Sequence, residues 1–377
     1  MKDPKKTREP PLGWKAVSLR LQAPNMIDLP KITDPVYDPT RAHTAWDRFF
    51  LRFLRDPRDL PFPYLTLKVA LLMLPLAVLL YMPFVRGWLW GLIAVVYFYL
   101  NNITFKGPFG LMMHCSTHRP LYRDAYGALN HIIPWFIAPF FGQSPETYRA
   151  HHVGMHHTEN NLENDESSTM SYRRDSVRGF AHYYLRFLFT GIVTLAMYLF
   201  RRKRKRLFIG VVRGELLFIL FCTAMSFVDL PATLVVFIIP FFIFRLVAMA
   251  GNWVQHTFVD ADEPGHHFKN SITCINVPFN HRCWNDGYHI SHHIDPTMHW
   301  TEHPAYFMEH IAEFAENEAV VFAGLNYMDV FVRLMGKRYD LLARHFVDID
   351  GRYASDEAVI AFLKSRTSPI PVLVEKG

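Results

Sequence analysis

The sequence predicts an all-α integral membrane protein with four transmembrane helices in two hairpins and a cytoplasmic helical cap that carries clustered histidines. Three observations lead to this fold class. Half of the 377 residues are hydrophobic and only 20% are charged, so the chain has enough apolar surface to fold. The apolar residues form runs long enough to cross a bilayer. Ten of the 20 histidines stand in four tight groups outside those runs.

The first pair of apolar runs precedes the first histidines. No charged residue occurs from Val69 to Val85 or from Gly87 to Phe105, and only Arg86 separates the two runs. A hydrocarbon core needs roughly 20 helical residues, so each run predicts one span. Pro75 predicts a kink in the first helix, because proline removes a backbone donor.

The second pair of runs covers residues 207–228 and 231–250, with a tight turn predicted at 229–231. Three charged residues fall inside this pair: Arg213, Glu215 and Arg245. Charges at membrane depth are costly unless they are paired or face a cavity, so this hairpin is expected to hold some of them inside the protein.

Two shorter apolar stretches are not predicted to span. Leu129–Gly142 has the length of a re-entrant or interfacial segment. Tyr183–Phe200 leads directly into the basic run 201–206, RRKRKR, and is interpreted as an interfacial helix with a membrane-surface anchor.

The distribution of Lys and Arg predicts the orientation. Residues 1–61 hold twelve of them and residues 113–206 hold thirteen, whereas the two tight turns hold one and none. The positive-inside rule therefore places the long segments and both termini in the cytoplasm. The predicted organisation is a soluble cytoplasmic segment (1–60), a membrane-embedded domain (61–310) and a cytoplasmic helical tail (311–377), in which VVFAGLNYMDVFVRLM predicts a helix.

The grouped histidines point to metal binding. They lie in HCSTH (114–118), HHVGMHH (151–157), NWVQH (252–256) and HISHH (289–293). Residues three and four apart share one face of a helix, so each motif directs imidazoles into one volume. Imidazole suits iron, zinc, copper and nickel, and a single zinc needs about four ligands. Around nine convergent histidines therefore imply two ions.

Topology agrees with this interpretation. With four spans every histidine group emerges on the cytoplasmic side, whereas a fifth span at Tyr183–Phe200 would place the last two groups on the opposite side. The metal hypothesis and the positive-inside rule thus both favour four transmembrane spans.

The motifs HCSTH, HHVGMHH and HISHH resemble the three histidine boxes, HxxxH, HxxxHH and HxxHH, of the membrane fatty-acid desaturase and hydroxylase superfamily. NWVQH resembles the additional ligand pair of its acyl-CoA desaturase branch. The resemblance covers roughly residues 60–310 and implies two non-haem Fe²⁺ ions. The ligands it implies are His114, His118, His152, His156, His157, Asn252, His256, His289, His292 and His293.

The second motif leaves one ligand open between His151 and His152. His152 is favoured, because it lies four residues before His156 and shares its helical face. Asn252 is expected to hold a metal-bound water or to orient a ligand. Four carboxylates are candidates for bonds to ligand N–H groups: Glu159, Asp165, Asp286 and Asp295. Three further histidines are interpreted as structural: His131, His299 and His303.

The resemblance implies an O2-dependent oxidoreductase of lipid metabolism that introduces a double bond into a long-chain fatty acid or acyl lipid. Oxidative decarboxylation of free fatty acids to terminal alkenes, hydroxylation or ketolation, and a histidine-based metal transporter remain alternatives. The sequence shows no dinucleotide-binding or haem motif, so electrons are expected from an external ferredoxin, rubredoxin or cytochrome b5-like donor with its reductase. Four arginines are possible ligands for a substrate head group: Arg149, Arg173, Arg174 and Arg245.

Overall fold

The computed structural model describes residues 31–371, and within them the chain is predominantly helical. The first 30 residues of the predicted cytoplasmic segment and the last six of the predicted tail lie outside the described residues. The N-terminal part of the described chain contains α1 (Ala45–Leu51) and leads into η1 (Pro57–Asp59). Thr44 caps α1 by accepting from the backbone N–H of Asp47.

The first apolar pair forms a helical hairpin. Its first arm comprises η1, α2 (Pro61–Leu72) and α3 (Leu74–Leu80), and the helix is interrupted at Met73. The interruption lies two residues before Pro75, as expected for a residue that lacks an N–H and clashes with the preceding turn. The second arm runs without a break through α4 (Gly87–Tyr99), η2 (Leu100–Phe105) and α5 (Lys106–His118).

The second hairpin consists of α9 (Lys205–Val228) and the helix formed by α10 (Leu230–Thr233), η7 (Leu234–Ile238) and α11 (Ile239–Gln255). Asp229 caps the second arm by accepting from the N–H of Ala232. Before this hairpin lies α8 (Val177–Arg201), which begins six residues ahead of the predicted interfacial stretch. Five helical segments of the described chain are therefore long and apolar enough to cross a membrane, one more than the sequence predicts.

The remaining segments are short. The stretch 129–142, predicted to be re-entrant or interfacial, falls in three irregular helices, η3 (Asp124–His131), η4 (Ile132–Ile137) and η5 (Ala138–Phe141). The second histidine motif forms α6 (Thr147–His151), η6 (His152–His156) and α7 (His157–Glu159). After α11 come α12 (His267–Asn270), α13 (Pro278–Arg282), α14 (His289–Ile294), α15 (His303–Glu309), α16 (Ile311–Glu316), α17 (Tyr327–Met335), α18 (Tyr339–Ala343) and α19 (Asp356–Ser365).

The sheet found in the described chain pairs β1 (Ile272–Ile275) with β2 (Val320–Ala323) in parallel, with Ile272 opposite Val320. The predicted helix in VVFAGLNYMDVFVRLM is therefore wrong in its first part. Val320 and Val321 are β-branched and buried, which favours a strand, and Gly324 then turns the chain with φ of +77°. The helix begins only at Tyr327.

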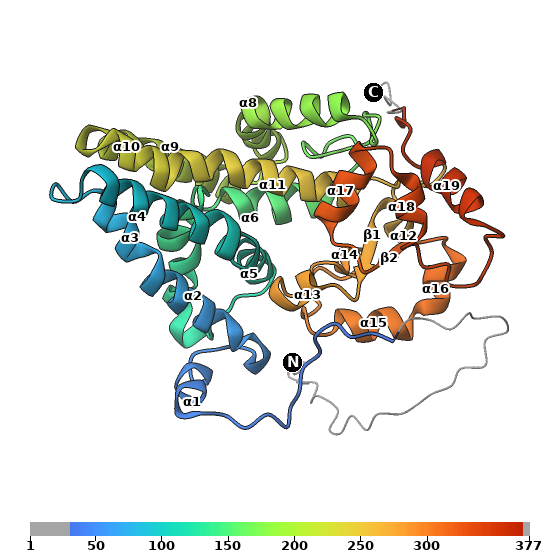
Figure 1. Cartoon of the computed structure of the whole chain (residues 1–377), viewed down its shortest axis with the longest axis horizontal. Helices are drawn as coiled ribbons and strands as arrows, with labels where there is room; N and C mark the ends of the chain where they lie inside the picture. Colours follow the sequence, from blue (N-terminus) through green and yellow to red (C-terminus); the bar gives the residue numbers. More distant parts are fainter. Residues whose placement is uncertain (1–30, 372–377) are drawn as a thin grey trace, which may run out of the picture.

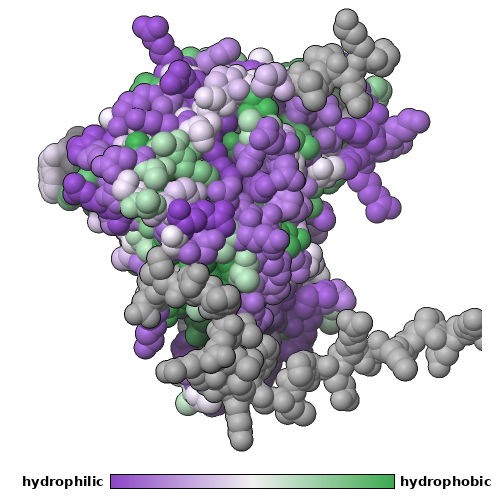
Figure 2. Space-filling view, turned by 90° about the vertical axis from the view of Figure 1, so that its right-hand side faces the viewer, coloured by the Kyte–Doolittle hydropathy of each residue, from purple (hydrophilic) through white to green (hydrophobic). Residues whose placement is uncertain are grey.

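The long helices and the short elements occupy opposite sides of the molecule. Helices α3, α4, α9 and α10 lie on one side, and the elements from α12 to α19 with the sheet form a cap on the other (Figure 1). Large apolar side chains such as Trp88 and Phe227 are exposed on the helical side, whereas the face of the cap in Figure 2 is largely hydrophilic. Such a contrast suits a protein whose helices contact lipid and whose cap contacts water.

Candidate metal centre

The histidine motifs come together where the long helices meet the cap. His114 and His118 occupy the last turns of α5, and His256 follows the end of α11. The second motif lies on α6, η6 and α7, and the fourth on α14. Segments almost 180 residues apart in the chain are thus joined at one place, because His114 and His292 have their Nε2 atoms 2.9 Å apart.

The histidines form two groups, and within each group the ligand atoms all lie within 4.8 Å of one another. The first group is His114, His118, His152, His157 and His292. The second group is His156, His256, His289 and His293. Nine imidazoles in two groups match the expectation from motif spacing that these residues converge on two ions.

The geometry inside each group fits a bound cation. In the first group, Nε2 of His292 lies 2.9 Å from Nε2 of both His114 and His157. In the second, Nε2 of His289 lies 3.2 Å from that of His256 and 3.0 Å from that of His293. A neutral imidazole nitrogen has either one hydrogen or one lone pair, so one such atom cannot be properly hydrogen-bonded to two others. Lone pairs directed at a shared metal account for the convergence.

The protonation state of these rings also suits metal binding. Burial lowers the pKa of His152, His157, His289, His292 and His293 well below the ordinary value, and the neighbouring imidazoles add to this effect. Rings with such low pKa values are neutral near pH 7, which is the form that ligates a metal.

Outer contacts fix several of the rings. Nδ1 of His156 lies 2.6 Å from the buried carboxylate of Asp165, and Nδ1 of His256 lies 2.8 Å from the carbonyl oxygen of Asn270. Nδ1 of His114 lies 3.4 Å from Oδ1 of Asp286. Contacts of this kind set the tautomer and the orientation of a ligating ring. Asp165 and Asp286 therefore occupy the positions that the sequence analysis expected of them.

The other two candidate carboxylates contact different partners. Glu159 accepts hydrogen bonds from the hydroxyl of Tyr198 and the guanidinium of Arg202. Asp295 accepts from the backbone and hydroxyl of Thr297. These two candidates therefore bind other partners than ligand imidazoles. Both side chains instead bind the residues nearest to them on α8 or in their own turn.

Asn252 lies one turn before His256 on α11. Its Nδ2 donates to the carbonyl oxygen of Ser167 and to the hydroxyl oxygen of Tyr183, both at 2.8 Å. Because these bonds use both hydrogens of the amide nitrogen, the amide oxygen is the atom left for another contact. Asn252 borders the same cavity as His156 and His289.

His151 and His152 point in different directions. His152 belongs to the first group, with its Nε2 3.1 Å from that of His157. His151 lies outside both groups, with its ring centre 5.4 Å from that of Phe187, and its buried Nε2 has no hydrogen-bond partner among residues 31–371. Tyr148, which the sequence analysis did not single out, stacks on His152 with the ring centres 5.4 Å apart.

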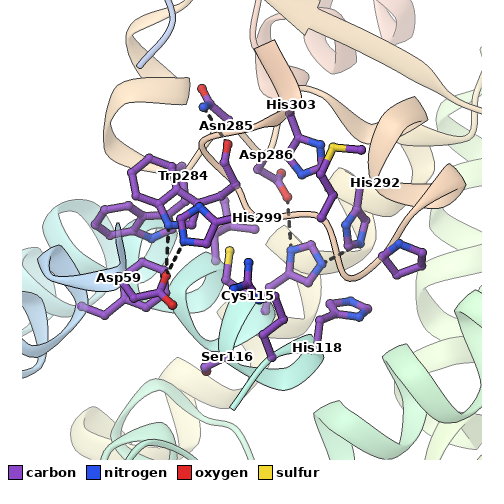
Figure 3. A pocket seen from close by; sticks show the side chains of 18 of the residues that line it. Asp59, Cys115, Ser116, His118, Trp284, Asn285, Asp286, His292, His299 and His303 are labelled. Carbon is purple, nitrogen blue, oxygen red and sulfur yellow. Dashed lines mark hydrogen bonds and ion pairs between the residues drawn. The ribbon is translucent and has the colours of Figure 1, made fainter. Parts of the chain in front are cut away.

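A small cavity of about 30 Å³, with polar and apolar side chains in its walls, borders the first group on one side. Figure 3 shows His118 and His292 at one side of this cavity and Trp284, His299 and Asp59 at the other, with Asp286 between them. His299 has its Nε2 3.0 Å from the carboxylate of Asp59 (Figure 3). The hydroxyl of Ser291 is 2.8 Å from Nδ1 of His303. Such contacts agree with structural roles for His299 and His303.

A larger cavity of about 400 Å³ reaches both groups from the other side. Its polar walls include His114 and His152 of the first group and His156 and His289 of the second. Its apolar walls come from α5, α11 and the start of α17, and include Leu111, Phe244, Val247, Met249, Phe279 and Met328. The volume is within the usual range for a small-molecule site, and the lining suits an alkyl chain.

The arginines proposed for a head group do not share one site. Arg174 is completely buried, and its guanidinium donates to carbonyl oxygens of the chain, among them those of Thr257 and Ser368. Arg173 is exposed and pairs with Asp175. Arg245 is buried next to Glu215, with 4.0 Å between the charged atoms. Arg174 is therefore a structural residue, and its guanidinium is not free to be the head-group ligand that the sequence left possible.

The large cavity is lined by Asp286 and by a basic residue that the sequence analysis missed. Lys106, at the start of α5, lines the cavity together with the histidines. The sequence did mark Lys106 as unusual, because it is the charged residue that directly follows the uncharged run Gly87–Phe105.

Comparison with known proteins gives one family. The sequence model described as "Fatty acid desaturase" matches residues 103–324, which is more than half of the chain and includes both histidine groups. No curated protein matches the chain.

Proposed function

The chain belongs to the fatty acid desaturase family, and from this premise we propose that it is a membrane-bound di-iron oxidoreductase that introduces a double bond into a fatty acyl chain. One observation carries the proposal: two groups of buried or half-buried imidazoles lie at the wall of an apolar cavity. The groups supply ligands for two metal ions, and the cavity supplies room for an alkyl chain beside them.

The proposed ligands are the nine histidines of the two groups. His114, His118, His152, His157 and His292 would hold one Fe²⁺, and His156, His256, His289 and His293 the other. Asn252 would complete the second group through its amide oxygen, either directly or through a water. Bound iron would supply the reduction of O2 and the removal of hydrogen from an unactivated C–H bond, which side chains cannot perform unaided.

The chain's own residues would bind and position the substrate. Apolar walls such as Phe244 and Met249 exclude water and hold the alkyl chain against the histidines. A –CH2–CH2– unit loses two hydrogens in the reaction. They leave with O2, two electrons and two protons as two molecules of water. The electrons must come from an external donor, for which we propose a ferredoxin, rubredoxin or cytochrome b5-like protein with its reductase.

Four spans fit the positions of the histidines. His157 and His256 lie in adjacent groups, yet α8, α9 and the α10–α11 helix separate them in the chain. Two residues on the same side of a membrane are separated by an even number of crossings. The tight turn at Asp229 makes α9 and α10–α11 a hairpin of two crossings, and α8 is then left at the membrane surface.

The side chains of α8 support this placement. Its exposed apolar residues recur every four positions, which forms a stripe along one face: Leu185, Phe189, Val193 and Met197. Its C-terminus continues into the basic run 201–206. An apolar stripe followed by basic residues is typical of a helix that lies in the interface next to anionic lipid. We therefore propose a cytoplasmic active site with both termini on that side.

Product analysis tests the proposed reaction. Cells that express the chain should contain a fatty acyl species that is two hydrogens lighter at unchanged chain length, as measured by mass spectrometry. His292→Ala should abolish this species, and His43→Ala, at an exposed histidine far from both groups in the sequence, should leave it unchanged. A terminal alkene one carbon shorter than a cellular fatty acid would show that the reaction is decarboxylation. An acyl species heavier by one oxygen would show that it is hydroxylation.

A further inference from the structure

A buried lysine lies in the same cavity as the histidines. Lys106 is only 4% exposed and lines the 400 Å³ cavity. Its ammonium donates to the carbonyl oxygen of Phe141 at 3.3 Å and lies between the rings of Phe141 and Phe244, with its nitrogen 5.7 and 5.4 Å from their centres. Within residues 31–371, no carboxylate lies within ion-pair distance of this nitrogen.

The nearby buried arginine provides a contrast. Arg245 lies 4.0 Å from Glu215 and donates to the carbonyl oxygen of Gly142 at 3.2 Å. Glu215 in turn accepts hydrogen bonds from the hydroxyls of Ser144 and Thr147. The charge of Arg245 is therefore balanced within the protein, whereas that of Lys106 meets one carbonyl and two aromatic faces. A buried cation without a counter-ion is strongly unfavourable, and a bound carboxylate would supply the missing negative charge.

The position of Lys106 relative to the histidines is set by α5. Lys106, Gly110 and His114 follow one another at four-residue intervals and all line the cavity. Eight residues of helix separate Lys106 from His114 by about 12 Å along the axis. The ammonium is directed away from the histidines, because it reaches Phe141, whose neighbour Phe140 accepts a hydrogen bond from Asn101 in the preceding turns.

We infer that Lys106 binds the carboxylate of a free long-chain fatty acid, so that the substrate of this site is an unesterified acid. The inference rests on the proposed function, in that it assigns the polar end of the chain which that function oxidises. A carboxylate supplies the charge that Lys106 lacks. An ester or thioester carries no charge at that carbon and would leave Lys106 without a counter-ion.

The placement also determines which carbons react. The distance along α5 requires several methylene groups between the carboxylate at Lys106 and the carbons next to the histidines. Oxidation is therefore expected within the chain and not at the carbons beside the carboxylate. Loss of CO2 to give a terminal alkene would need those carbons at the metal and is incompatible with a carboxylate held by Lys106.

Ligand binding to the purified full-length, iron-loaded protein tests the inference. A saturated long-chain acid and its methyl ester are titrated by calorimetry in the same detergent. Wild type should bind the acid about 10- to 100-fold more tightly than the ester, the preference expected of one charge-assisted hydrogen bond. Lys106→Met should reduce the affinity for the acid to that for the ester, and Lys106→Arg should restore most of the preference.

Lys68→Met is the matched control, because Lys68 is exposed on α2 and does not line the cavity. It should leave both affinities unchanged. Equal binding of acid and ester by wild type overturns the inference even if Lys106→Met fails to fold, as does a terminal alkene product. If wild type prefers the acid but yields no oxidised product with O2 and reductant, the carboxylate site stands and the proposed function fails. If wild type forms the desaturated product but Lys106→Met still prefers the acid to the ester, the assignment of the carboxylate to Lys106 is wrong and the proposed function stands.

Discussion

The two histidine groups differ in how their rings are held. In the second group all four residues are buried, and two rings are fixed by short contacts, from His156 to Asp165 and from His256 to the carbonyl of Asn270. In the first group His118 and His157 are partly exposed, and the outer contact of His114 to Asp286 is longer, at 3.4 Å. The first group also borders both cavities.

This difference suggests a division of tasks. A group whose rings are fixed by buried partners has a geometry set before any ligand arrives. The first group lies between two cavities, and the larger of them has room for an alkyl chain. We therefore expect the second group to be the more rigid of the two, and its iron affinity to depend more on the outer contacts of its ligands than that of the first group.

The largest effect is expected from removing a ligand of the first group. His292 contributes the nitrogen that lies 2.9 Å from those of both His114 and His157. His292→Ala should lower iron from about two to about one per chain and activity by well over 100-fold, which exceeds the loss typical of an outer contact. Elemental analysis and product formation measure the two effects. Two retained irons would show that the groups do not bind metal independently.

A smaller effect is expected from loosening the second group. Asp165→Asn removes the charge next to His156 but keeps a side chain of the same shape. Iron affinity of that group should fall by about 10- to 100-fold, measured by titration with a chelator. Asp165 also accepts bonds from Ser167 and the backbone of Asn161, so the unfolding temperature should be recorded alongside. Loss of both irons at the same chelator concentration would contradict the division between the groups.

Asp286→Asn makes the corresponding change at the first group. Because the contact with His114 is 3.4 Å long and Asp286 borders both cavities, the loss of iron affinity should stay below about tenfold. The same chelator titration gives the comparison directly. A loss equal to that of Asp165→Asn would mean that contact length does not distinguish the two groups.

The smallest effect is expected at His151. Its ring lies outside both groups, so His151→Phe should retain two irons and most of the activity, whereas His152→Ala should behave like His292→Ala. Iron content of the two variants measured side by side assigns the ligand of the HHVGMHH motif. Loss of iron from His151→Phe alone would reverse the assignment.

The sequence predicts much of this structure because the signals are local. Spacing of three and four residues brings imidazoles to one helical face, and uncharged runs of about 20 residues form the two hairpins. His152 was favoured because it shares an α-helical face with His156, but in the structure it lies on the π-helical η6 and converges with His157, and His156 belongs to the other group. Lys106 marked the end of an apolar run, but its direction into the cavity depends on the packing of α5 against Phe141 and Phe244.

Other features depend on contacts between distant segments and could not be predicted in this way. Val320 and Val321 form a strand because β1 lies beside them, nearly 50 residues earlier in the chain. Glu159 binds Tyr198 instead of an imidazole because α8 packs next to α7. A charged side chain in the sequence has many possible partners, and only the tertiary fold selects one.

The buried guanidinium of Arg174 has a consequence for the order of assembly during synthesis. It binds the carbonyl of Thr257, the residue after His256, and the carbonyls of Arg366 and Ser368 near the end of the chain. A ribosome releases those last residues only after all the histidines have been made. The guanidinium that binds the backbone next to His256 therefore acquires its full set of partners only once residues 366–368 have left the ribosome.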